Sequence, residues 1–109
     1  MTRHIITHNE IEGFHYYPNA PKFCEYLANK HRHIFVIDCW FEVSHNEREI
    51  EIIEMQHRIE NMIANKFGRP ANFDSMSCES IAETIMNEFC NIESCIVTED
   101  GNGGAALTR

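Results

Sequence analysis

Three histidines in the first third of the chain have the residue type and spacing of a metal site. His31 and His33 form a His-x-His pair at the start of an apolar, alternating stretch, and His15 follows an earlier hydrophobic stretch. In an extended strand, alternate side chains share a face, so the pair offers two imidazoles about 7 Å apart at the backbone. A third imidazole from a neighbouring strand would complete a three-histidine set with an open fourth position, which is typical of catalytic zinc. The alternative is that these are three unrelated members of the seven histidines of the chain.

The composition predicts one acidic globular domain. A chain of 109 residues, 43% of them hydrophobic, is long enough for a single domain over residues 1–109 with its own core. The formal net charge of −8 argues against nucleic acid or an anionic membrane as the main partner. It also disfavours a polyanionic substrate, unless lysines and arginines gather at the site.

Hydropathy and cysteine usage predict a cytoplasmic protein. No apolar stretch approaches the ~20 residues of a membrane helix, and the N-terminus lacks the apolar core of a signal peptide. The odd number of cysteines and the absence of a Cys-x-x-Cys pair indicate free thiols, most of them buried. The five cysteines are Cys24, Cys39, Cys78, Cys90 and Cys95.

The hydrophobic pattern predicts the element order β, β, α, α, β, β. The predicted strands cover residues 5–17, 31–43, 92–99 and 105–108. The predicted helices cover residues 51–67 and 78–89, and Ser77 is the expected N-cap of the second. Residues 18–30 are predicted to form a loop, and Gly13 is expected at a bulge or kink in the first strand.

These elements predict an α+β fold, in which two helices pack on one face of a four-stranded antiparallel sheet. Both faces of the strand over residues 31–43 are substantially apolar, which is typical of a strand covered on both sides. Because the helices cover only one face, we expect the other face to be buried by association with further chains.

Five short segments follow one another in an order that is typical of one enzyme family. Phe14-His15 ends the first strand, Cys24 lies in a loop that begins with prolines, and His31-Arg32-His33 opens the second strand. Met76-Ser77-Cys78-Glu79-Ser80 begins the second helix, and Ile96-Val97-Thr98-Glu99 ends the third strand. Over nearly the whole chain these segments resemble the 6-pyruvoyl-tetrahydropterin synthase and 6-carboxy-tetrahydropterin synthase family. The corresponding family segments include Phe-x-Ala-Ala-His, His-Gly-His and Pro-Thr-Ser-Glu-Asn.

The resemblance implies a zinc ion on His15, His31 and His33. It implies Glu99 as the anchor of a 2-amino-4-oxo-pyrimidine ring, and the chemistry agrees, since a carboxylate accepts hydrogen bonds in pairs and that ring edge has two adjacent N–H donors. Glu79 is a secondary substrate-binding residue on the same basis. Its alternative role is to compensate the dipole of the second helix.

The resemblance also implies Cys24 as the catalytic base, because a cation nearby lowers the pKa of a thiol. A buried loop thiol without a catalytic role is the alternative for Cys24. The chain departs from the family in three places, of which the first is a longer spacing from Cys24 to His31. It has no Leu-Asp-His segment after the first helix, where the synthases carry a second acid–base group, and Arg32 replaces the glycine of His-Gly-His. His45 and His57 are the other histidines near the predicted core elements, and neither position suggests a replacement for that group.

The implied activity is that of a zinc-dependent carbon–oxygen lyase acting on 7,8-dihydroneopterin triphosphate or a related pterin. Such a step belongs to tetrahydropterin or 7-deazaguanine (queuosine precursor) biosynthesis. The implied assembly is that of the tunnelling fold: trimeric rings whose sheets join into a barrel, stacked as a homohexamer, with Glu99 facing the metal of a neighbouring subunit. The alternatives are a non-catalytic zinc-containing pterin- or purine-binding homologue that has lost its acid–base relay, and a purely structural ring subunit.

Overall fold

Two long strands form the centre of the sheet. In the computed structural model, which describes residues 1–109, β1 (Arg3–His15) and β2 (His31–Val43) pair antiparallel over their full length. Their register places His15 opposite His31 and Gly13 opposite His33. The three predicted metal ligands therefore lie at one end of the sheet.

Three further strands complete a mixed, five-stranded sheet of order β3-β1-β2-β4-β5. β4 (Ile92–Glu99) pairs antiparallel with β2, and β5 (Gly103–Thr108) pairs antiparallel with β4. On the other side, β3 (Ala71–Asn72) pairs parallel with the end of β1. The α+β class is confirmed, whereas the prediction of a purely antiparallel sheet of four strands is wrong. A strand of two residues is too short to produce a periodic pattern, which is why the sequence did not reveal β3.

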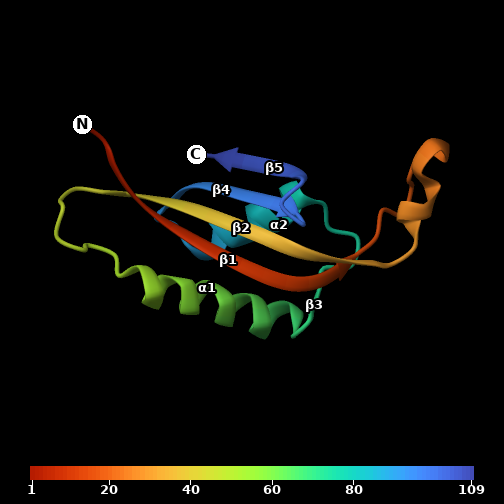
Figure 1. The fold of residues 1–109 in the computed structure, drawn as a ribbon, viewed down its shortest axis with the longest axis horizontal. Helices are drawn as coiled ribbons and strands as arrows, with labels where there is room; N and C mark the ends of the chain where they lie inside the picture. Colours follow the sequence, from red (N-terminus) through yellow and green to blue (C-terminus); the bar gives the residue numbers. More distant parts are fainter.

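Both α-helices begin and end within one residue of the predicted bounds. α1 (Ile52–Phe67) begins after Glu51, whose side chain accepts a hydrogen bond from the Glu54 amide, and it ends at Gly68, where φ is +89°. α2 (Cys78–Glu88) is capped by Ser77, whose hydroxyl accepts from the Ser80 amide. Figure 1 shows α1 running along β1, with α2 behind β4.

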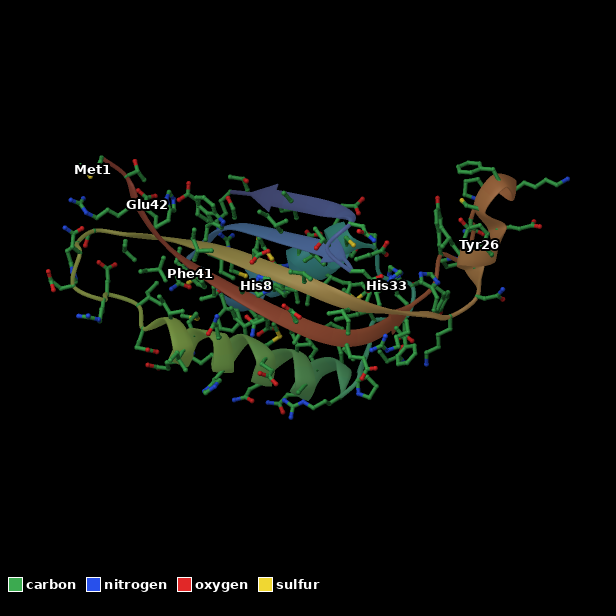
Figure 2. The ribbon with its side chains drawn as sticks, viewed as in Figure 1. Met1, His8, Tyr26, His33, Phe41 and Glu42 are labelled. Atoms are coloured by element: carbon green, nitrogen blue, oxygen red, sulfur yellow. The ribbon has the colours of Figure 1, made fainter.

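The predicted loop over residues 18–30 contains a 3₁₀-helix, η1 (Lys22–Ala28). This segment projects beyond the end of the sheet, and Figure 2 shows it carrying Tyr26 past His33. Aromatic side chains of this segment and just before it are exposed to solvent. Tyr17, Phe23 and Tyr26 retain 50%, 86% and 68% of their accessible surface.

The core lies between one face of the sheet and the two α-helices. Alternate residues of β2 are completely buried, and residues spaced by four on each α-helix pack against them. These fully buried residues include Phe35, Ile37, Cys39, Phe41, Ile59, Ile81 and Ile85. The opposite face of the sheet has no helix over it, and Ile6 and Trp40 there remain 47% and 37% exposed. No helix of the chain is both long and apolar enough to cross a membrane.

Gly13 allows close packing near the end of β1. A Cβ atom at this position would lie 2.9 Å from Cε2 of Phe73 and 3.1 Å from the carbonyl oxygen of Ala71. The pairing of β1 with β2 is regular here, so the expected bulge at Gly13 is wrong. The irregularity in the sheet lies instead between Trp40 and Phe41, where β2 pairs with β4.

Gly104→Ala should lower the free energy of unfolding by about 1–3 kcal/mol, because the new methyl group would overlap the strand beside it. A Cβ atom on Gly104 would lie 1.9 Å from the carbonyl oxygen of Val97 and 2.6 Å from Cα of Thr98. Gly103→Ala is the matched control, since nothing lies within 4 Å of its Cβ position. Urea denaturation of the two variants and the wild type makes the comparison. Equal unfolding midpoints for the two alanine variants would contradict the close approach of β5 to β4.

Candidate metal centre

Four side chains from three strands converge on the core face at one end of the sheet. His15 is the last residue of β1, His31 and His33 begin β2, and Glu99 is the last residue of β4. One nitrogen or oxygen atom from each of them lies within 4.8 Å of the others. Figure 2 shows His33 at this end of the sheet, next to the segment that carries Tyr26. The structure thus brings together the three predicted metal ligands and adds the carboxylate of Glu99.

Two of the imidazoles are oriented by backbone carbonyls. Nδ1 of His15 lies 2.9 Å from the carbonyl oxygen of Met76, and Nδ1 of His31 lies 2.8 Å from that of Asn29. A carbonyl oxygen only accepts, so each Nδ1 must carry the proton. In the neutral imidazole the lone pair is then on Nε2, which is the arrangement that metal-binding histidines commonly have.

The third imidazole is oriented by a carboxylate. Nδ1 of His33 donates to Oδ2 of Asp100 at 2.7 Å, and Oδ1 of Asp100 accepts from the Ile34 amide at 2.8 Å. Asp100 adopts a φ of +55°, which turns the chain directly after β4. The Ile34 amide and the His33 side chain lower the pKa of Asp100, so its carboxylate is ionised at neutral pH. From the sequence, Asp100 was predicted only as part of a turn. Its position next to Glu99 was the one signal that could have indicated a role in the site.

The Nε2 atoms of His15 and His33 are buried and have no hydrogen-bond partner. Oε2 of Glu99 lies 2.7 Å from Nε2 of His15 and 3.6 Å from Nε2 of His33, but neither contact has hydrogen-bond geometry. A carboxylate oxygen beside a nitrogen lone pair is repulsive, and a cation between them removes the repulsion. These residues fit a divalent metal ion, and the nitrogen-rich donor set suits a transition metal better than calcium or magnesium.

A cavity of about 570 Å³ adjoins the four side chains. His15, His31 and Glu99 form part of its wall, and α2 contributes Cys78 and Glu79. Its volume is within the range of small-molecule sites. Glu79 therefore lies where a pterin-binding residue is expected, and its carboxylate makes no hydrogen bond or ion pair within the chain.

The cavity contains Cys78 in place of the expected cysteine. Cys24 is buried within η1 and is not part of the cavity wall, because the segment between it and His31 forms η1 instead of leading directly into β2. The prediction of Cys24 as a base beside the metal is therefore not supported by its position. Burial raises the pKa of Cys78 to about 11, with smaller contributions from the Glu99 and Glu79 carboxylates, so the thiol is neutral at pH 7.

Glu99 lies beside the histidines of its own chain. It does so because the end of β4 pairs with β2 only two residues beyond His33. The expectation that it faces the metal of a neighbouring subunit stays a prediction. A scan of protein-family models finds no match to this chain, and a search of curated proteins finds none either. The resemblance to the pterin synthases accordingly stays a prediction from the sequence.

The purified protein should contain about one equivalent of divalent metal, and His31→Ala should lose most of it. His57→Ala is the matched control, because His57 is exposed on α1 and lies outside the cavity wall. Elemental analysis after dialysis measures the metal, and circular dichroism verifies that each variant is folded. Equal metal content in folded His31→Ala and His57→Ala would contradict the site.

Asp100→Asn should weaken metal binding by about 10–100-fold, because loss of the carboxylate removes the charge that supports His33. The asparagine oxygen can still accept from the Ile34 amide, so the turn is preserved. Asp38→Asn is the control, since Asp38 holds His8 away from the site. Chelator competition measures both affinities. An Asp100→Asn affinity equal to that of Asp38→Asn would show that Asp100 serves only the turn.

Proposed function

We propose that this protein is a zinc-dependent enzyme of the pterin synthase type, a carbon–oxygen lyase that acts on the side chain of a reduced pterin. The observation that supports it is a set of three histidines, His15, His31 and His33, each with its Nδ1 hydrogen-bonded, beside a cavity of ligand size. Three imidazoles are a common protein donor set for catalytic zinc. The reaction class and the pterin come from the resemblance described above.

In this proposal the strand ends would bind the metal ion and α2 would bind the pterin ring. His15, His31 and His33 would hold the zinc ion, which supplies a Lewis acid that polarises an oxygen of the substrate side chain. Glu79 has no partner within the chain and is free to accept N–H donors of the pterin ring. Glu99 lies 2.7 Å from Nε2 of His15, so its carboxylate would be available as a fourth ligand.

A non-catalytic pterin-binding protein is the second candidate, and one specific observation favours it. The cavity wall contains no histidine apart from His15 and His31 and no cysteine apart from the neutral Cys78. His45 and His57 are exposed and do not reach the cavity. An acid–base relay would therefore have to come from Cys78, from the two tyrosines of the wall, or from another subunit.

A single-turnover experiment separates the two candidates. Zinc-loaded protein is mixed with a substoichiometric amount of 7,8-dihydroneopterin or its triphosphate, and binding and product formation are followed together. Turnover that is lost in His31→Ala supports the enzyme. Binding without turnover supports the second candidate, whereas absence of both contradicts the proposed function.

Glu99→Gln should weaken zinc binding by about tenfold, because a neutral amide replaces a carboxylate among the ligands. Glu79→Gln should leave zinc binding unchanged and weaken pterin binding by about 2–4 kcal/mol, because an N–H donor then faces another donor. Metal titration and pterin fluorescence measure the two quantities in each variant. Weakened pterin binding with full zinc affinity in Glu99→Gln would instead assign the ring to Glu99.

We further propose a homohexamer built from two trimeric rings. The helix-free face with exposed Ile6 and Trp40, and the unpaired outer edge of β5, are the surfaces that association would bury. Light scattering at micromolar concentration should give a mass about six times the 12.7 kDa of one chain. A monomer would contradict the assembly and weaken the resemblance on which it depends.

A further inference from the structure

The charges that line the cavity are all negative. Its wall includes the carboxylates of Glu79 and Glu99 and contains no lysine or arginine. The Asp100 carboxylate lies directly behind His33, so a third negative charge is close. A divalent metal ion bound to the histidines would neutralise two of these three negative charges. The site would then have no net positive charge to attract a polyanion such as a triphosphate.

The basic residues nearest in sequence to the site are engaged elsewhere. Nζ of Lys30 lies over the ring of Phe14, 5.1 Å from its centroid. Arg32 points to the helix-free face of the sheet and forms an ion pair with Glu12. Neither residue contributes to the cavity wall.

The remaining basic residues are no better placed. Lys22 is exposed on η1 and does not line the cavity, and Arg48 lies between β2 and α1, beyond the Val43 end of β2 that is opposite to His31. The others bind carboxylates, carbonyl or amide oxygens or an aromatic ring away from the cavity; they are Arg3, Arg58, Lys66, Arg69 and Arg109.

The N-terminus of α2 does not replace these missing cations. Ser77 and Cys78 bring this positive end of the helix dipole to the cavity. However, the Ser77 hydroxyl already accepts from the Ser80 amide, and Glu79 places a carboxylate in the first turn. A phosphate group approaching this helix end would meet that carboxylate at close range.

We propose that the cavity selects a reduced pterin, or a similar heterocycle rich in N–H donors, whose side chain carries no phosphate. This inference rests on the proposed function and narrows its substrate, since the resemblance alone implies a triphosphate. Carboxylates accept from the amino and ring N–H groups of such a heterocycle and repel phosphate oxygens. The buried Nε2 atom of His15, which lines the cavity, has no hydrogen-bond partner, and the unpartnered Nε2 of His33 belongs to the same four-residue group, so a metal-binding end adjoins the carboxylates.

The test compares two probes on the zinc-loaded wild type at one ionic strength. By fluorescence titration, 7,8-dihydroneopterin should bind at least tenfold more tightly than 7,8-dihydroneopterin triphosphate. Equal or tighter binding of the triphosphate would overturn the inference and leave the proposed function intact. Failure of both probes to bind would overturn both.

A charge reversal at the cavity wall provides the second test. Glu79→Lys should raise the affinity for inorganic triphosphate, a probe without the pterin ring, at least tenfold, because it replaces a repulsive charge by an attractive one. Glu83→Lys makes the same change in net charge on the exposed side of α2, outside the cavity wall. Equal triphosphate affinities in the two variants would contradict exclusion of phosphate by the cavity charges.

Discussion

The register between β1 and β2 determines where the atoms of the site lie. It places His15 opposite His31 and sets His33 on the same face of the sheet as the buried core residues. A shift of one residue would turn both β2 histidines to the helix-free face. The completely buried Phe35 and Ile37, next along the same face, resist such a shift because it would expose them to water. The same strand register therefore fixes both the packing of the core and the geometry of the site.

The same end of the sheet concentrates polar groups that gain stability only with a cation. Two buried Nε2 atoms lack hydrogen-bond partners, and a carboxylate oxygen of Glu99 lies beside them. Unsatisfied buried polar atoms cost free energy, and a bound metal ion replaces that cost by ligand bonds. Metal binding at this site would therefore be linked to folding and would stabilise the folded chain.

Regular periodicity in the sequence was sufficient to predict the long elements and the common face of His31 and His33. The alternation through β2 placed His31 and His33 on one face with Phe35, and the N-cap at Ser77 located the start of α2. The sequence did not reveal the two-residue β3 or η1, because neither is long enough to be periodic.

Contacts between distant segments were the least accessible to prediction. The role of Asp100 depends on its approach to His33, 67 residues away in the chain. Likewise, the exclusion of Cys24 from the cavity depends on how η1 folds. Such contacts follow from the tertiary structure. A sequence motif therefore identifies candidate residues but does not specify which residues contact them in space.

The site proposed above has one metal ion on the Nε2 atoms of His15, His31 and His33. Anomalous diffraction at the zinc absorption edge, from crystals of the zinc-loaded protein, tests it most directly. A single peak is expected about 2.0–2.1 Å from each of the three Nε2 atoms. A crystal with full zinc occupancy at another position, and with these three nitrogens unligated, would contradict it.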